Sequence, residues 1–142
     1  MTTVQQVLML KGHHVHSIGP QALVYDAVAL MARHGVGALL VMDGDRLVGV
    51  FSERDYTRKI TLQGRNSKET LVADIMTVDV FTVSATTRTH DCMALMSAKK
   101  IRHLPVLDGD RVLGMISIRD IMDDIIADHE STIATLHSYI HS

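Results

Sequence analysis

Two thirteen-residue segments of this chain end in the same group of chemically active side chains. DGDRLVGVFSERD runs from Asp43 to Asp55, DGDRVLGMISIRD runs from Asp108 to Asp120, and both end in Ser-x-Arg-Asp. The N–H groups of a first helical turn favour an anion, a carboxylate accepts hydrogen bonds from a vicinal diol, and hydroxyl groups donate to phosphate. If each Ser lies where a strand meets a helix, the motif suits ribose and phosphate together. The candidate residues are Ser52, Arg54, Asp55, Ser117, Arg119 and Asp120.

Ordinary helix capping is the alternative explanation of this motif. A Ser at the cap and an acidic residue in the first turn form a common arrangement that involves no ligand. Capping alone, however, does not require the same Arg in both copies, nor a Gly three residues before each Ser, at Gly49 and Gly114. A Gly lets another backbone or a flat base come close. The duplication therefore favours binding, with capping as the competing hypothesis.

The motif belongs to an internal repeat. An offset of 65 aligns residues 15–56 with 80–121 without a gap, and ten of the twenty positions from 37 to 56 are identical to their counterparts. In each copy the pattern predicts a strand, a helix, two strands joined by Asp-Gly, and a second helix. The expected elements are 15–18, 23–34, 39–42, 46–51 and a helix after Ser52, then 80–83, 88–100, 104–107, 111–116 and a helix after Ser117.

These elements predict a mixed α/β (α+β) fold of two β-α-β-β-α repeats related by pseudo-twofold symmetry. A C-terminal helix should follow, because Ile125, His129, Ile133, Leu136 and Ile140 continue a helical stripe to about residue 140. The expected divisions are a first repeat at 1–63, a linker at 64–70, a second repeat at 71–126 and a helical extension at 127–142.

Composition and charge argue against several classes of protein. The 142 residues carry a formal net charge of −2, which gives no basic field for nucleic acid. No apolar run approaches the roughly 18 residues of a membrane span, and the N-terminus lacks an export-signal pattern. The single Cys92 cannot form an internal disulfide, which agrees with a reducing compartment. We therefore expect a soluble cytoplasmic protein without nucleic-acid or membrane partners.

The segments GVFSERDYTRK and GMISIRDIMDD, each following LLVMDGD or LPVLDGD, resemble the two halves of a tandem CBS-domain protein, an arrangement also called a Bateman module. The resemblance covers about residues 4–126. The run FSERDYTRKITLQGRNSKETLVADIM and the ending YIHS are similar to small stand-alone two-CBS proteins of bacteria and plant organelles. One Gly-x-x-Ser-x-x-Asp is a weak signal, but its duplication within this order of elements makes the resemblance specific.

This resemblance implies a non-catalytic regulatory module that binds AMP, ADP, ATP or NAD(H) in clefts between the repeats. Asp55 and Asp120 would hold ribose, and Ser52 and Ser117 would lie beside ribose and phosphate. The module would signal to an unknown partner in trans and form a homodimer, with no catalytic cofactor. The alternative is a structural homodimerisation module with vestigial clefts. Positions near adenine would be His16, Val36, Gly37 and Ala38 for one pocket, and Phe81, Ile101, Arg102 and His103 for the other.

The two repeats differ where they would hold this ligand. Gly37 and Ala38 of the first repeat align with Arg102 and His103 of the second. We infer that the two clefts differ in phosphate preference and that at least one suits a ligand with few phosphates. Arg102 and His103 would reach a phosphate, and one option is the phosphate of the nucleotide whose ribose the other repeat holds.

Histidines raise the question of a metal site. His13, His14 and His16 lie close together in sequence, and His137 and His141 lie one helical turn apart. Structural zinc sites require four closed ligands, and no Cys or carboxylate lies near the first group, whereas histidines at the end of a helix also suit its dipole, so no metal is expected. An enzyme is not expected either, because the chain lacks a Gly-x-Ser-x-Gly elbow and a paired acid and base.

Two further positions have competing interpretations. Cys92 lies on a helix of Ala, Leu and Met, and we expect an inert core thiol rather than a redox sensor. Arg58 and Lys59 align with Asp123 and Asp124, so the two equivalent helices carry opposite charge at one place. Either each group is solvated separately, or the helices contact each other across the pseudo-twofold or between protomers.

Overall fold

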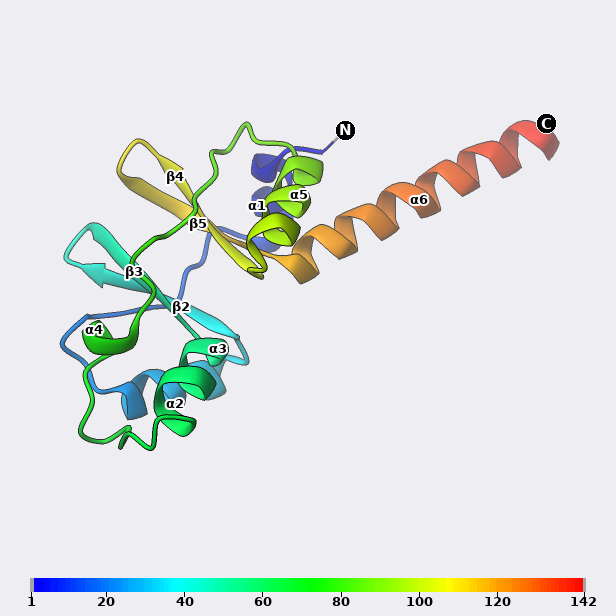
Figure 1. The fold of residues 1–142 in the computed structure, drawn as a ribbon. Coiled ribbons are helices and arrows are strands. Elements are labelled where there is room, and N and C mark those ends of the chain that lie inside the picture. Colours follow the sequence, from blue (N-terminus) through cyan, green and yellow to red (C-terminus); the bar gives the residue numbers. More distant parts are fainter. Residues whose placement is uncertain (1, 142) are drawn as a thin grey trace.

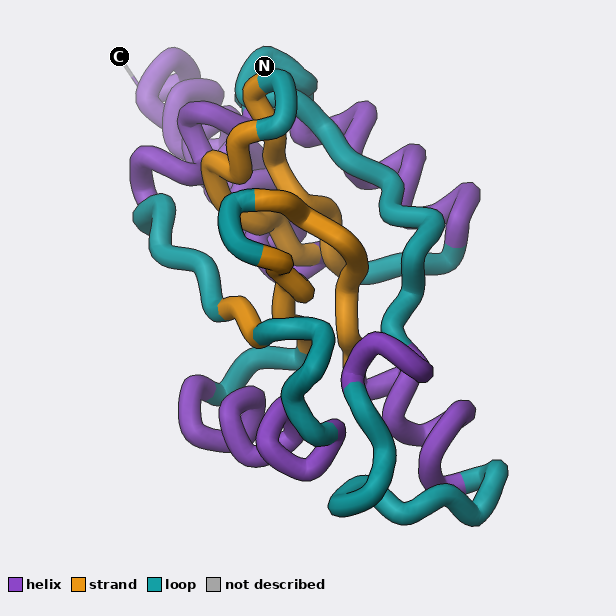
Figure 2. The backbone as a smooth tube through the Cα atoms, turned by 90° about the vertical axis from the view of Figure 1, so that its left-hand side faces the viewer, coloured by secondary structure: helices purple, strands orange, loops and turns teal. Residues whose placement is uncertain are grey.

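Two units, each built around a β-hairpin, and one long helix that leaves them make up the fold (Figure 1). The computed structural model describes residues 2–141, apart from the side chains of residues 131, 132, 135 and 139–141. The side chains of Ile140 and His141, which belong to the predicted stripe and histidine pair, therefore lie outside the described residues, as does Ser142. Figure 2 shows the strands gathered in the middle of the body with helices around them.

The two hairpins have the same register. Strand β2 (Ala38–Asp43) pairs antiparallel with β3 (Arg46–Ser52), and β4 (His103–Asp108) pairs antiparallel with β5 (Arg111–Ser117). Each hairpin turns at the predicted Asp-Gly, where Gly44 and Gly109 adopt φ values of 62° and 61°, a conformation that Gly reaches without strain. Each register also shifts once before the turn, between Val41 and Met42 or between Val106 and Leu107. The predicted strand pairs are confirmed.

The short first strand predicted for each repeat forms in the first repeat only. β1 (Ser17–Ile18) pairs parallel with β2, and the N–H of Leu40 donates to the carbonyl of His16. In the second repeat the position of Leu40 is occupied by Pro105, which has no N–H to donate. The predicted strand at 80–83 is therefore wrong in extent, because it is reduced to a single bridge between Val83 and Val106.

Most helices lie where periodicity placed them. α2 (Val24–His34) and α5 (Thr89–Lys99) match the predicted ranges within a residue. After Ser52 the chain forms α3 (Glu53–Tyr56) and a π-helical turn, η1 (Thr57–Thr61). After Ser117 a single continuous helix, α6 (Ile118–His141), includes both the last helix of the second repeat and the predicted C-terminal extension. The mixed fold class is confirmed.

Two helices were not predicted, and they exchange places between the units. α1 (Val4–Lys11) packs in the core of the second unit, and α4 (Val72–Ile75) packs in the core of the first. Equivalent backbone hydrogen bonds hold them. The N–H of Val4 donates to the carbonyl of Thr87, and the N–H of Val72 donates to the carbonyl of Ala22. Each unit therefore completes its core with a helix that comes before the other repeat in sequence.

The exchanged helices explain the Gly before each Ser. A Cβ at Gly49 would lie 2.7 Å from Met76 Sδ and 2.9 Å from the carbonyl oxygen of Thr77, and a Cβ at Gly114 would lie 3.0 Å from Leu8 Cδ2. Gly49 thus admits a close backbone, as the sequence suggested, whereas Gly114 admits a leucine side chain. In both cases the close neighbour is protein, from the end of α4 or from α1.

Candidate functional site

Both Ser-x-Arg-Asp motifs lie where a strand passes into a helix. In the first, the N–H and hydroxyl of Ser52 donate to Asp55 Oδ2 over 3.0 and 3.1 Å, and the N–H of Asp55 donates back to Ser52 Oγ over 3.2 Å. Ser117 and Asp120 repeat this arrangement at 2.8, 2.9 and 3.2 Å. The capping geometry is therefore present at both corners, and a ligand role needs support beyond it.

The second oxygen of Asp55 is occupied by the protein itself. Asp55 Oδ1 accepts a hydrogen bond from Thr77 Oγ1 at 3.0 Å and lies 3.1 Å from Lys59 Nζ. Lys59 also donates to the carbonyl of Ile75. Only 7% of Asp55 is exposed, so this carboxylate is a buried charge with donors on both oxygens, as buried charges require.

Asp120 receives its cation from a different part of the chain. Lys11, the last residue of α1, places Nζ 2.7 Å from Asp120 Oδ2 and 2.8 Å from the carbonyl oxygen of Met115. Partial burial alone would raise the pKa of Asp120, but hydrogen bonds from Lys11 and Ser117 outweigh it and hold that pKa below its ordinary value. Asp120 is therefore ionised and bound to α1 at neutral pH.

A cleft of about 660 Å³ opens beside Asp55 and reaches both units. Eight of the residues predicted from sequence line it: Gly37, Ser52, Arg54, Asp55, Phe81, Ile101, Arg102 and His103. The cleft therefore combines the Ser-x-Arg-Asp motif of one repeat with the positions predicted near adenine in the other. Its further lining residues are Val50, Glu53, Thr57, Arg58, Lys59, Thr77, Asp79 and Val80.

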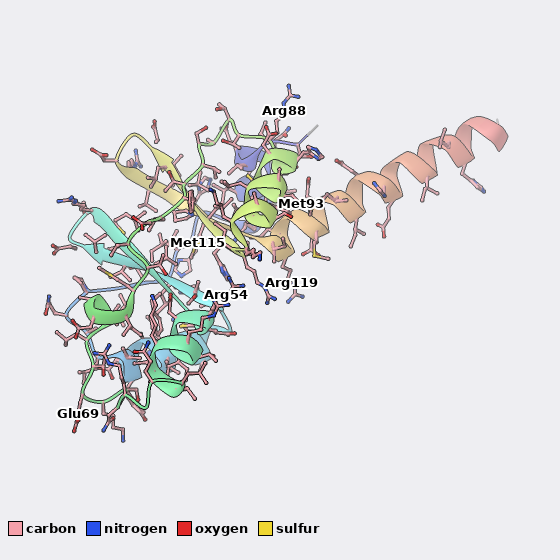
Figure 3. All side chains as sticks on the ribbon, viewed as in Figure 1. Arg54, Glu69, Arg88, Met93, Met115 and Arg119 are labelled. Atoms are coloured by element: carbon pink, nitrogen blue, oxygen red, sulfur yellow. The ribbon has the colours of Figure 1, made fainter. Side chains whose placement is uncertain are left out.

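The other predicted positions lie elsewhere. Ala38 is buried in β2, and Val36 is partly buried beside the core of the first unit. His16 stacks on the ring of His34 at 3.9 Å and meets His14 edge-on at 4.5 Å. Ser117 and Asp120 lie at the second strand-to-helix junction with Lys11, and Arg119, labelled in Figure 3, is the second residue of α6 there.

Arg54 and His103 connect the two sides of this cleft. Arg54 extends from α3 toward the second unit (Figure 3), and its Nη1 donates to the carbonyl of Lys100 at the end of α5. His103 Cε1 lies 3.5 Å from where a Cβ on Gly37 would be. Burial lowers the pKa of His103, against the opposing charge of Asp120, so the ring is neutral at pH 7. The space left by Gly37 thus faces the ring of His103.

The family follows from comparison with known proteins. The CBS domain family matches residues 4–61 and again residues 72–127. The chain belongs to the CBS-domain family. A mitochondrial CBS-domain protein of Arabidopsis thaliana, CBSX3, is 38% identical over 98% of this chain and 72% of its own length. The crystal structure of a putative signal-transduction protein with CBS domains from Burkholderia ambifaria is 48% identical, covers 89% of this chain and 96% of that one, and superposes with a TM-score of 0.86.

A more distant CBS structure shares the fold alone. It is a CBS domain pair, 22% identical, that covers 90% of this chain and 98% of that one with a TM-score of 0.80. That pair was crystallised in complex with 5′-methylthioadenosine and S-adenosyl-L-methionine. The predicted resemblance to tandem CBS proteins is therefore confirmed, including its likeness to a plant-organelle relative.

Three residues that contact Asp55 or Asp120 were not predicted as site residues. Lys59 could have been found, since it lies four residues after Asp55 on one helical face. Thr77 lies 22 residues from Asp55, and Lys11 lies 109 residues from Asp120. No local pattern signals these two contacts, because they depend on how α1 and α4 are exchanged between the units.

The remaining polar features have local explanations. Cys92 is fully buried, and burial raises the pKa of its thiol to about 11, so the expected core thiol is confirmed. Lys59 binds Asp55, whereas Asp124 accepts a hydrogen bond from Thr89 Oγ1 at 3.1 Å. Within the described part of the chain, no group of three His, Cys, Asp or Glu residues is placed to hold a metal ion. Over the same residues, no helix is both long and apolar enough to cross a membrane.

Proposed function

We propose that this CBS pair binds an adenine nucleotide in the cleft beside Asp55 without catalysing a reaction on it, and that a separate partner protein recognises the nucleotide-bound state. AMP, ADP, ATP and NAD(H) are the candidate ligands. The observation that carries the proposal is the composition of the cleft, which combines Ser52 and Asp55 of one repeat with Arg102 and His103 of the other. Localisation in the cytoplasm remains a prediction, since the Arabidopsis relative is named as mitochondrial.

The charges around the cleft support a phosphate-bearing ligand. Arg54, Arg58 and Arg102 line it together with Lys59, and Arg side chains suit phosphate because their donors form a planar fork. Ser52 Oγ and Asp55 lie at the beginning of α3, where a diol of ribose would exchange for the internal donors of the carboxylate. The exposed ring of Phe81 gives the cleft an apolar wall for a base.

The ligand class is supported by the distant CBS pair. Both compounds in that crystal structure contain adenosine, which is the part of a nucleotide that a ribose-binding acid and an apolar wall would recognise. Neither compound carries a phosphate, so the comparison does not specify how many phosphates the ligand of this chain has. The four arginine and lysine side chains of the cleft favour a ligand with at least one phosphate.

Signalling would require that the ligand prefers one arrangement of the two units. A ligand shifts a conformational equilibrium only by its differential affinity for the two states. The bond from Arg54 to the carbonyl of Lys100 joins the two sides of the cleft, so a phosphate that captures the Arg54 guanidinium would release this link. The partner would then recognise a changed position of α5 or a changed angle between the two units.

Isothermal titration calorimetry with AMP, ADP, ATP and NADH tests the proposal. Asp55→Asn keeps the size of the side chain and removes its charge, and we expect at least a tenfold loss of affinity. Asp120→Asn is the matched control, because it makes the same change at the other corner and should leave this cleft intact. Binding by none of the four nucleotides, or equal affinity in Asp55→Asn and the parent, would refute the proposal.

A structural homodimerisation module is the second candidate. The observation in its favour is that both acids already have internal partners, Lys59 and Thr77 for Asp55 and Lys11 for Asp120. In that case Asp55→Asn would lower the melting temperature without any nucleotide effect. A nucleotide at a hundredfold excess over its Kd should stabilise the parent by roughly 2.7 kcal/mol and so raise its melting temperature. Such a rise would decide against this candidate.

A further inference from the structure

The outward face of α6 carries a line of exposed apolar side chains. The helix has 24 residues and is therefore about 36 Å long, and Figure 1 shows its C-terminal part extending well beyond the two units. The family match ends at residue 127, so this outer part is not explained by the CBS fold. Met122, Ile126, Ile133 and Leu136 are exposed by 51%, 53%, 66% and 57%.

A helix of this composition needs a partner to be stable. Three of the five residues from 131 to 135 are Ser or Thr, which are poorer helix formers than Ala or Leu. Helices in proteins owe most of their stability to packing of an apolar face rather than to intrinsic propensity. The inner residues Ile118, Ile121 and Ile125 pack on the second core, but the outer face has no such support from the described residues of its own chain.

The spacing of the outer face identifies what would cover it. Met122, Ile126, His129, Ile133 and Leu136 are separated alternately by four and three residues, and by sequence Ile140 continues the series. This average spacing of 3.5 residues is typical of the seam of a two-helix coiled coil. We call these residues the α6 seam. A narrow seam of this kind fits a like helix better than a broad groove.

We propose that the α6 seam joins two copies of this chain in an antiparallel helix pair. The acidic side chains of α6 all lie at or before residue 130, at Asp120, Asp123, Asp124, Asp128 and Glu130, and no Lys or Arg follows Arg119. An antiparallel pairing places this acidic half beside the acid-free half of the partner and opposes the two helix dipoles. Ile126 would face Leu136 of the partner subunit.

The proposal assigns a surface to the homodimer that the family resemblance implies, and it does not involve the nucleotide cleft. An anionic membrane is a poorer occupant, because interfacial helices that bind such membranes carry Lys and Arg on their polar face. The seam instead has acidic neighbours, which a membrane surface of the same sign would repel.

Sedimentation velocity on the full chain tests the seam. We expect the parent to sediment as a dimer at micromolar concentration, and I133E/L136E to associate at least about 100-fold more weakly because unpaired carboxylates would be buried. The control A134E/S138E adds the same charge on the opposite face and should remain dimeric. A monomeric parent, or a dimer of I133E/L136E as tight as the parent, would overturn the proposal. Titration of each variant with the nucleotide separates this result from the fate of the cleft.

Disulfide trapping tests the direction of the pair. A mixture of I126C chains and L136C chains should crosslink to each other under mild oxidation, because these positions face one another only in the antiparallel register. The native Cys92 is buried and does not interfere. Crosslinks between two I126C chains, without I126C to L136C products, would overturn the antiparallel assignment.

Discussion

The carboxylates at the two strand-to-helix junctions, Asp55 and Asp120, are neutralised by cations from different parts of the chain. At the first, Lys59 pairs with Asp55 from four residues further along, in the π-helical turn η1 that follows α3. The equivalent of Lys59 in the second repeat is Asp124, which cannot pair with an acid, and there the cation is Lys11, at the end of the exchanged helix α1. The repeats thus share the need for a cation beside a partly buried carboxylate, but not the position in the chain that supplies it.

The largest effect should come from removing the more buried acid. Asp55→Ala leaves Lys59 and the hydroxyl of Thr77 without their carboxylate and removes the Asp55 half of the capping box at Ser52. We expect a loss of about 2–4 kcal/mol in the free energy of unfolding, and about half of this for Asp120→Ala, whose side chain is 19% exposed. Urea denaturation measures both. Equal losses at the two corners would break the distinction between them.

The glycine positions should show the same ranking by a different mechanism. Gly49→Ala places a methyl group 2.9 Å from the carbonyl oxygen of Thr77, which cannot move without shifting backbone. Gly114→Ala meets the flexible end of Leu8 at 3.0 Å. We expect losses of about 2–3 and about 1 kcal/mol, read from thermal unfolding of the two variants. A larger loss at Gly114 would show that the second core is the more rigidly packed.

The helix ends offer a stabilising change. α2 ends at Gly35 with φ 64°, whereas its counterpart α5 ends at Lys100 with φ 55°, the one non-glycine residue with positive φ within residues 2–141. Lys100→Gly removes this strain and keeps the carbonyl that accepts from Arg54, so a gain of about 0.5–1 kcal/mol is expected. The reverse change, Gly35→Lys, should cost a similar amount. A destabilised Lys100→Gly variant would point to a role for the Lys100 side chain itself.

The smallest effect should depend on pH. Because Asp120 has a lowered pKa in the folded protein, its stabilising effect is fully present above the unfolded pKa of about 3.9 and is lost as pH falls through the folded value. Lys11→Met should therefore lower stability by about 0.5 kcal/mol at neutral pH and by progressively less below about pH 4. Urea midpoints of variant and parent, measured from pH 7 downward, should converge in acid. A gap that stays constant would assign the effect of Lys11 to packing.

Local patterns predicted most of the fold. Asp-Gly turns, helical spacing and an ungapped repeat located the hairpins, α2 and α5 within one or two residues. α1 was missed although Thr3 and Gln6 form a capping box, a signal that was readable in the sequence. The strand expected at 80–83 failed because Pro105 removes a donor in its neighbour, an effect that needs the pairing partner to be known.

Half of the residues that line the candidate cleft had been named from the sequence. The Ser-x-Arg-Asp motif and the positions implied by the family resemblance gave eight of the residues that line the cleft. A cleft between the repeats was expected from the family resemblance, and one option placed Arg102 and His103 beside a nucleotide held by the other repeat, but which of the named residues meet depends on the packing of one unit against the other. His16, in contrast, was named near adenine but is not among the residues that line the cleft, and its ring packs against His34 and His14.

What the amino-acid sequence determined by itself is the content of each repeat: its turns, its strand register and the acid at each corner, because these depend on residues within a few positions of one another. The tertiary structure alone decided which helix completes which core, and so brought Lys11 to Asp120 across 109 residues. The apolar face of a helix does not by itself specify which surface it packs against, because hydrophobic burial is non-directional. Only the packing of the whole chain selects that surface.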